Sequence, residues 1–318
     1  MTPVLATVED TPVTFTGSDG KIWIVYELSL VNFTGGAMVF IEIAVDAGAP
    51  VPTQLSHRLS ITAQAAPPGS QNLTEDVPAI DVTSSQVPIG QNPLRGEGYV
   101  SADSCCSNRH RRAALAINNE VFLSQRFAVD WEQVDSAGKI YQGDPAAVAS
   151  YEIYGKAAYA FANSTVVAAV DGLPDQVPQT VKDVTLQNAD GNHIVLDLGN
   201  GNYVLYAHLI PGSLTVKVGD QANAGDVLGK VGNSGNSIAP HLHFHMMSAA
   251  SPLVSNGLPY ALSAFTVTGQ VAGDTADQRT VAFDKAEAKG TVLPTVPSPN
   301  DGARQDEFPL DQLLITMQ

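Results

Sequence analysis

Turn-forming residues interrupt this chain so often that long helices have little room to form. Between the turns lie short runs rich in Val, Ile, Thr and aromatic residues, such as KIWIVYELSLVNF at 21–33 and GNHIVLDLGNGNYVLYAHL at 191–209. β-Branched and aromatic residues favour strands, and short strands separated by frequent turns favour antiparallel sheets. The 27 glycines and 20 prolines fit the same pattern. We therefore predict a mainly β protein.

The strand-rich runs divide the chain into four parts. We expect a small β-sandwich-like domain over residues 1–90 and a turn-rich linker over 91–109. A second, antiparallel β domain is expected over 110–268. The remaining segment, 269–318, is rich in Asp, Ala and Pro, and we expect it to be a tail that is partly docked or disordered.

The charge of the chain argues against two classes of partner. Asp and Glu number 32 against 16 Lys and Arg, which gives a formal net charge of −16. Such a chain repels nucleic-acid phosphates and anionic lipid surfaces, so we expect no nucleic-acid partner. No apolar run is long enough to span a bilayer, so we also expect no membrane insertion.

The two cysteines of the chain are neighbours, Cys105 and Cys106. Adjacent cysteines cannot join distant strands, and a disulfide between them is rare because its geometry is unfavourable. Two thiols are also too few for a four-cysteine zinc site. We therefore expect two free thiols.

Three of the seven histidines alternate along one short run, PHLHFH at 240–245. In an extended strand, alternate side chains share a face, so His241, His243 and His245 point the same way while Leu242 and Phe244 can be buried opposite them. Two more histidines, His193 and His208, lie within the preceding 50 residues or so. A catalytic zinc ion needs about three nitrogen or oxygen ligands and an open position. The best carboxylate candidate is Asp130 of QRFAVDW, in a run that we expect to be extended from Arg126 onward.

Residues 150–245 resemble the lysostaphin-like (LytM-type) peptidoglycan metalloendopeptidases. The matching stretches are YGKAAYAFANSTVVAAVDG, GNHIVLDLGNGNYVLYAHL, VKVGDQANAGDVLGKVGNSGNS and PHLHFH, in the family's order. The resemblance implies an antiparallel β-sheet groove with zinc at its floor. It implies that Asp130 and His243 are metal ligands, and that His208 and His241 act on the bound water and the transition state. It also implies a secreted or periplasmic protein whose signal peptide is absent from this chain.

The chain departs from the family pattern at one ligand. The family's first ligand is a histidine four residues before the aspartate, and here that residue is Arg126, which has no lone pair to give to a metal. Three outcomes are open. His110, His245 or His193 supplies the third ligand; zinc binds only weakly; or Arg126 pairs with Asp130 and takes the place of the metal.

Two functions follow from these alternatives. The first is a zinc-dependent endopeptidase that acts on the peptide of bacterial cell wall. The second is a catalytically degenerate member of the same fold, which binds cell-wall peptide or a partner hydrolase. A third interpretation, a biotin or lipoyl carrier hairpin over 216–232, is disfavoured because Lys230 does not lie at a hairpin tip. The oligomeric state stays open.

Overall fold

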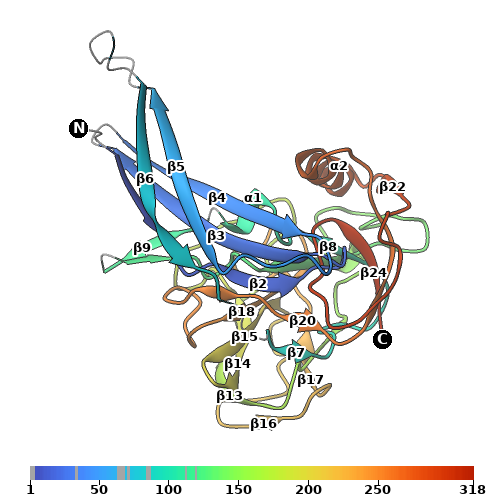
Figure 1. Cartoon of the computed structure of the whole chain (residues 1–318). Helices are drawn as coiled ribbons and strands as arrows, with labels where there is room; N and C mark the ends of the chain where they lie inside the picture. The colour runs from blue at the N-terminus through green and yellow to red at the C-terminus, as the bar shows by residue number, and fades with distance from the viewer. Residues whose placement is uncertain are drawn as a thin grey trace. The chain divides into compact units, whose positions relative to one another are not determined.

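The computed structural model describes residues 4–32, 35–62, 69, 72–83, 87–111, 113–118 and 120–318 (Figure 1). The chain forms two compact units, Met1–Gln86 and Val87–Gln318. Nearly all regular structure in both units is β-strand, and almost every strand pairing is antiparallel. The prediction of a mainly β protein with antiparallel sheets is therefore confirmed.

The first unit consists of a four-stranded sheet and a two-stranded ribbon. In the sheet, the long strand β3 pairs along one edge with β4 and along the other with β1 and β2. Strands β5 and β6 pair only with each other among the described residues. The six strands are β1 Val4–Val8, β2 Val13–Thr16, β3 Ile22–Asn32, β4 Gly35–Val45, β5 Gln54–Thr62 and β6 Asn72–Asp81.

The second unit is built on a twelve-stranded sheet. Its main path runs β16-β13-β14-β15-β18-β11-β8-β24-β21-β22, with β19 paired to β18 and β23 paired to β21. In chain order these strands are β8 Gly96–Ala102, β11 Val129–Gln133, β13 Ser164–Val170, β14 Asn192–Gly199, β15 Asn202–Leu209, β16 Gln221–Ala222, β18 Leu242–Met247, β19 Gly257–Leu258, β21 Phe265–Val271, β22 Thr295–Val296, β23 Gly302–Arg304 and β24 Leu313–Met317.

Short elements complete this unit. Three small two-stranded ladders pair β7 with β20, β9 with β10, and β12 with β17. Their bounds are β7 Ile89–Gly90, β9 Leu115–Ile117, β10 Glu120–Phe122, β12 Ala157–Tyr159, β17 Val227–Lys230 and β20 Ala261–Leu262. The helical elements are α1 Asn108–Arg111, the single 3₁₀ turn η1 Val148–Ser150, and α2 Ala276–Lys289.

The segments expected to be a linker and a tail both contribute strands to the large sheet. β8 lies within residues 91–109 and pairs with β11 on one side and β24 on the other. β24 lies within 269–318, where Leu313, Ile315 and Met317 are buried at alternate positions. The tail also contains α2, which begins with a capping box at Thr275. The polar composition of these two segments did not indicate strands or a helix. The predicted domain limits stay a prediction.

Two apolar faces bury the centre of the large sheet. On one face, Val195, Leu205, Ala207 and Met247 form a cluster across β14, β15 and β18. On the other face, Tyr206 and Phe244 pack edge to face, with their ring centroids 5.1 Å apart. Because Leu242 and Phe244 are fully buried on this second face, the alternating histidines of β18 point to the first, as the strand periodicity predicts.

Candidate metal centre

The register of two central strands brings a carboxylate to a histidine. β11 and β18 are antiparallel, and Asp130 lies directly opposite His243. The His243 Nδ1 atom is 2.8 Å from Asp130 Oδ1. Directly opposite residues in a sheet have Cβ atoms about 5 Å apart, so this pairing is enough to join the two side chains. The 113 residues that separate them in sequence are therefore no obstacle.

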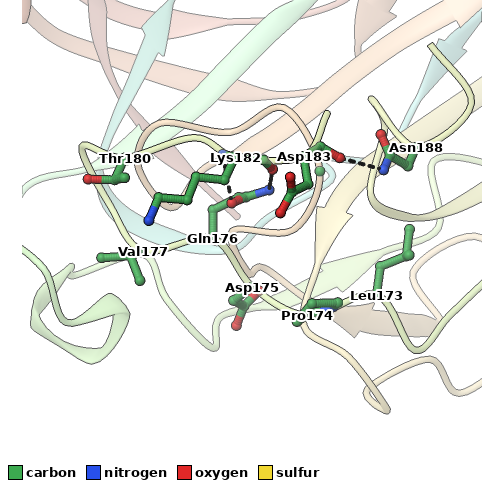
Figure 2. Close-up of a pocket in the computed structure, with 10 residues that line it drawn as sticks. Leu173, Pro174, Asp175, Gln176, Val177, Thr180, Lys182, Asp183 and Asn188 are labelled. Atoms are coloured by element: carbon green, nitrogen blue, oxygen red, sulfur yellow. Dashed lines mark hydrogen bonds between the residues drawn. The ribbon is translucent and has the colours of Figure 1, made fainter. Parts of the chain in front are cut away.

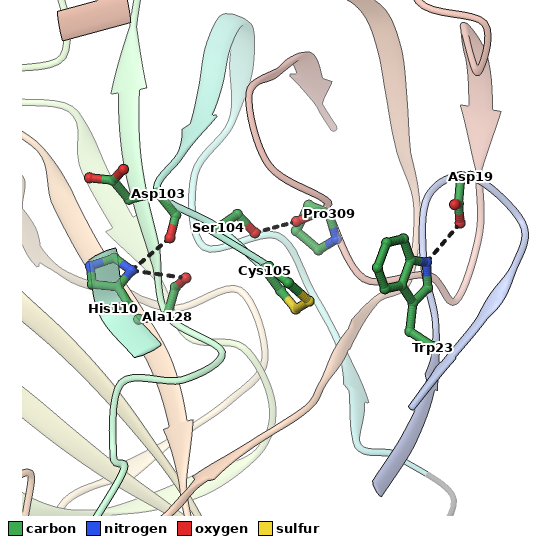
Figure 3. Close-up of a disulfide and its surroundings, with 9 residues drawn as sticks. Asp19, Trp23, Asp103, Ser104, Cys105, His110, Ala128 and Pro309 are labelled. Atoms are coloured by element: carbon green, nitrogen blue, oxygen red, sulfur yellow. Dashed lines mark hydrogen bonds between the residues drawn. A yellow bond between two sulfur atoms is a disulfide. The ribbon is translucent and has the colours of Figure 1, made fainter. Parts of the chain in front are cut away.

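A third side chain reaches the same carboxylate from the short helix α1. His110 Nε2 lies 3.2 Å from Asp130 Oδ2. On the other side of the ring, His110 Nδ1 lies 2.8 Å from the carbonyl oxygen of Asp103 and 3.3 Å from that of Ala128 (Figure 3). A carbonyl oxygen only accepts, so Nδ1 carries the hydrogen, and a neutral His110 directs the lone pair of Nε2 at Asp130. Metal-ligating histidines are typically oriented in this way.

Arg126 does not take this place. It lies in a turn closed by two backbone hydrogen bonds, in which the Arg126 N–H donates to Leu123 O and the Ala128 N–H donates to Gln125 O. The expectation of an extended run from Arg126 to Asp130 is therefore wrong. The Arg126 Nε–H donates to the carbonyl of Gly257 at 3.1 Å. In the part of the chain that the structure describes, the side-chain partners of Asp130 are three imidazoles, those of His110, His241 and His243.

Two further histidines face the carboxylate and His243. The ring centroids of His208 and His241 are 4.7 Å apart, and His241 Nε2 is 3.5 Å from Asp130 Oδ1. Backbone carbonyls hold the far side of each ring: His208 Nδ1 is 2.7 Å from Ser234 O, and His241 Nδ1 is 2.8 Å from Ala239 O. Both rings therefore carry hydrogen on Nδ1, and both direct Nε2 into the site.

The backbone of His208 adopts a conformation that few side chains tolerate. Its φ is +64°, in the left-handed region. The conformation is held by two backbone hydrogen bonds, from His208 N–H to Asp190 O and from Gly232 N–H to His208 O, each 3.0 Å long. Non-glycine residues with such a backbone cluster at functional sites, where the surrounding structure compensates for the strain.

Glycines let the loop at 232–237 approach His208 closely. A Cβ atom at Gly191, whose φ is +60°, would clash with the carbonyl of Ser234, the group that fixes the His208 ring. Ser234 Oγ also accepts the N–H of Asn192 at 2.9 Å. The sequence GNSGNS therefore forms a tight wall of the site, and its contribution is a backbone carbonyl that no side-chain pattern could reveal.

Electrostatics separates the charged members of the site from the neutral ones. Burial alone would raise the pKa of Asp130, but His110, His241 and His243 hold it well below its usual value. Burial disfavours the charged form of His110, yet Asp130 raises its pKa to about 9. Burial lowers the pKa of His208 and His245 well below the usual value and also lowers that of His243. Without metal, the core of the site is thus an ion pair between His110 and Asp130.

The remaining two histidine candidates, His245 and His193, are not among the side-chain partners of Asp130. His245 Nδ1 is 2.8 Å from His243 Nε2, on the side of that ring away from the carboxylate. His193 Nδ1 is 2.9 Å from the carbonyl of Gly191. Among the described residues, the groups whose ligand atoms lie within 4.8 Å of one another are His110, Asp130 and His243, and His208, His241 and His243.

The central side chains of the site line a cavity of about 370 Å³; they are those of His110, Asp130, His208, His241 and His243. Its rim includes Asp103, Arg109, Gln125 and Asp190. Asp103, Gln125 and Asp190 lie in turns without a recognisable motif, whereas Arg109 lies in helix α1. The cavity is large enough for several atoms of a substrate beside the histidines.

The expectation of free thiols is wrong. Cys105 and Cys106 form a disulfide with each other, and their Cα atoms are 2.9 Å apart (Figure 3). The pair lies between Asp103, whose carbonyl contacts His110, and helix α1, which carries His110. Disulfides between neighbouring cysteines are rare, so the sequence alone favours free thiols.

A second cavity of about 530 Å³ lies in the long connection between β13 and β14 (Figure 2). Two hydrogen bonds join Gln176 to the backbone of Lys182, and Asn188 Nδ2 donates to the carbonyl of Asp183 at 3.0 Å. The same connection supplies Ala189 and Asp190 to the metal-centre cavity. The two cavities thus share one loop.

The residues fit a zinc ion. His110 Nε2, Asp130 and His243 Nδ1 offer two nitrogens and one oxygen, which is a donor set of a catalytic zinc site, and their ligand atoms lie close together. The fixed Nδ1–H of His110 is the arrangement that presents Nε2 to a metal.

Among the helices that the structure describes, none is long and apolar enough to cross a membrane.

Comparison with known proteins finds similarity to one peptidase family. Residues 152–255 match the sequence profile of Peptidase family M23. Over 121 residues the chain is 32% identical to lysostaphin of Staphylococcus simulans and of Staphylococcus staphylolyticus. The aligned region covers 37% of this chain and 20% of each lysostaphin. The chain thus spans about a fifth of the length of these curated relatives. Among solved structures, the catalytic domain of the antimicrobial peptidase lysostaphin from S. simulans matches with 22% identity and a TM-score of 0.28, covering 51% of this chain and 86% of that one.

The profile match includes β13 to β18 and therefore three of the four histidines that line the cavity, His208, His241 and His243, whereas His110 and Asp130 precede it. The family resemblance that the sequence motifs indicate is confirmed. Residues 152–255 of this chain thus match Peptidase family M23 and resemble the lysostaphin-like (LytM-type) peptidases.

Proposed function

We propose that this chain is a zinc-dependent endopeptidase that cleaves the peptide of bacterial cell wall. The observation that carries the proposal is the convergence of His110, Asp130 and His243 on one point, with His208 and His241 across the same cavity. The loss of the family's usual histidine at Arg126 is offset because His110 supplies a third donor from another element. The substrate class rests on the match to Peptidase family M23 and to lysostaphin.

His110, Asp130 and His243 would hold the zinc. Bound there, zinc would supply Lewis acidity at the floor of the cavity, which activates water and polarises a carbonyl. Binding requires that His110 lose the proton it shares with Asp130, since a protonated imidazole has no lone pair on Nε2.

His208 is the candidate general base. Burial keeps it neutral, and the Ser234 carbonyl keeps its hydrogen on Nδ1, so the lone pair of Nε2 faces the cavity and can accept a proton from the attacking water. The proton can then pass to the leaving amine. His241, when it carries a proton on Nε2, can donate a hydrogen bond to the developing oxyanion.

The chemistry of cell wall implies a place for the reaction. Peptidoglycan lies outside the cytoplasmic membrane, so we propose a secreted or periplasmic protein. The second candidate function, a binding module of the same fold, rests on Arg126 in place of the family's first ligand. It requires that the site fail to hold zinc.

Two measurements on the purified chain test the proposal. Metal analysis after zinc loading and dialysis is expected to give one zinc per chain, and digestion of purified peptidoglycan is expected to release new amino termini. Both are lost in His243→Ala and Asp130→Asn, and both persist in His193→Ala, a histidine variant outside the site. Absence of both zinc and cleavage in the unchanged chain would favour the binding module, and cleavage that survives His243→Ala would exclude zinc catalysis.

A further inference from the structure

His243 has hydrogen-bond partners on both sides of its ring. Nδ1 lies 2.8 Å from Asp130 Oδ1, and Nε2 lies 2.8 Å from His245 Nδ1. The two imidazole rings are nearly perpendicular, at 85°, with their centroids 5.0 Å apart. His245 is fully buried, and its Nε2 has no hydrogen-bond partner in the described part of the chain. His245 therefore has one polar contact in these residues, and that contact is His243.

Without metal, the chemistry of the partners fixes the direction of this contact. The Asp130 carboxylate can only accept, so His243 Nδ1 carries a hydrogen and donates it. A neutral imidazole has one N–H, and so His243 Nε2 is an acceptor. His245 must then donate from Nδ1, which leaves its own Nε2 without hydrogen.

With zinc bound, the same contact must run the other way. His243 gives the lone pair of Nδ1 to the metal, so its hydrogen is on Nε2 and points at His245 Nδ1. His245 then accepts at Nδ1 and carries its hydrogen on Nε2. The pair holds two protons in both states: one leaves His243 Nδ1, one moves from His245 Nδ1 to His243 Nε2, and one is taken up at His245 Nε2.

We propose that His245 is a positioning residue for the metal centre, holding the His243 ring through a hydrogen bond whose direction reverses when zinc binds. The inference rests on the proposed zinc function. Imidazole suits this position because each nitrogen can donate or accept, whereas a carboxylate could only accept and would serve the zinc-bound state alone. A neutral ring also adds no second buried negative charge beside Asp130.

Zinc affinity, measured by competition with a chromophoric chelator at fixed pH, tests the proposal. His245→Leu removes the hydrogen bond, and the expected loss of affinity is about 10- to 100-fold, the usual effect of losing such an outer partner. His245→Gln keeps an acceptor and a donor on one group, and is expected to retain affinity to within roughly threefold. His193→Gln is the matched control and is expected to leave affinity unchanged.

Imidazole ¹⁵N NMR of the unchanged chain gives the direct readout. Zinc is expected to move the hydrogen of His245 from Nδ1 to Nε2. In His243 the hydrogen is also expected on Nδ1 without zinc and on Nε2 with zinc. Urea unfolding of the metal-free variants separates this effect from misfolding, and if His245→Leu does not fold, the NMR result decides alone.

The outcomes distinguish this inference from the proposed function. If the unchanged chain binds no zinc, both fail. If it binds zinc but His245→Leu binds equally well, or if the His245 hydrogen stays on the same nitrogen, the inference is overturned and the proposed function stands. Equal losses in the Leu and Gln variants would likewise contradict a role in hydrogen bonding.

Discussion

Asp130 and His243 are register partners on β11 and β18, and a 2.8 Å contact joins their side chains. The pairing makes the metal centre a property of the sheet rather than of its loops, since a slip of one residue would turn His243 to the opposite face. Of the three proposed ligands, only His110 comes from outside these strands. His110 is therefore the ligand whose contribution most needs a direct test.

His110→Ala is expected to weaken zinc binding at least 100-fold, because it removes one of three protein donors. Chelator competition measures the change, with His193→Ala as the control for loss of a histidine outside the site. Full affinity in His110→Ala would mean that another residue completes the coordination.

His208→Gln is expected to lower kcat about 10²- to 10⁴-fold, the usual contribution of a general base. Zinc affinity should stay within a few-fold, because His208 is not one of the proposed ligands. Peptide hydrolysis and metal binding are measured on the same preparation. A comparable loss of zinc would instead place His208 in the coordination shell.

Gly191→Ala is expected to destabilise the chain by about 1–3 kcal/mol and to lower activity. The added Cβ meets the Ser234 carbonyl, which holds His208. Gly201→Ala is the matched control, because Gly201 also has a positive φ, +76°, but a Cβ there meets nothing within 4 Å. Urea unfolding and kcat are compared. Equal effects in the two variants would show that backbone conformation alone, and not the contact with Ser234, is responsible.

Buried carboxyl groups are expected to make the metal-free chain less stable as pH rises. Burial raises the pKa of Asp311 to about 8, far above its unfolded value near 4. Between these values the folded state keeps a proton that the unfolded state has lost, so stability falls as pH increases from about 4 to about 8.

Asp311→Asn removes this titration. The unfolding free energy of this variant, relative to that of the unchanged chain, is expected to rise by on the order of 4 kcal/mol between pH 5 and pH 9. Urea unfolding at both pH values measures the difference. Identical pH dependence in the two proteins would show that Asp311 ionises normally in the folded state.

Local sequence patterns predicted what depends on strand periodicity. The alternation of His241, His243 and His245 placed all three on one face, and burial of Leu242 and Phe244 opposite them follows from the same period of two. Family motifs pointed to Asp130 and His208, which the structure places in the same cavity. Their catalytic and ligand roles remain proposals.

Features that depend on long-range contacts could not be read from the sequence. His110 was one of several candidates, and only the folded position of α1 shows that it reaches Asp130. Arg126 occupied the expected ligand position in the sequence, but a turn removes it from the strand. β24 gains its place from pairing with β8 and β21, which its Asp- and Pro-rich surroundings did not indicate.

We propose that His110, Asp130 and His243 together hold one zinc ion. A crystal structure of the zinc-loaded chain, with anomalous diffraction measured at the zinc edge, would show whether they do. We expect a single strong peak within bonding distance of His110 Nε2, a carboxylate oxygen of Asp130 and His243 Nδ1. A site without zinc, with the Arg126 guanidinium against Asp130, would contradict it.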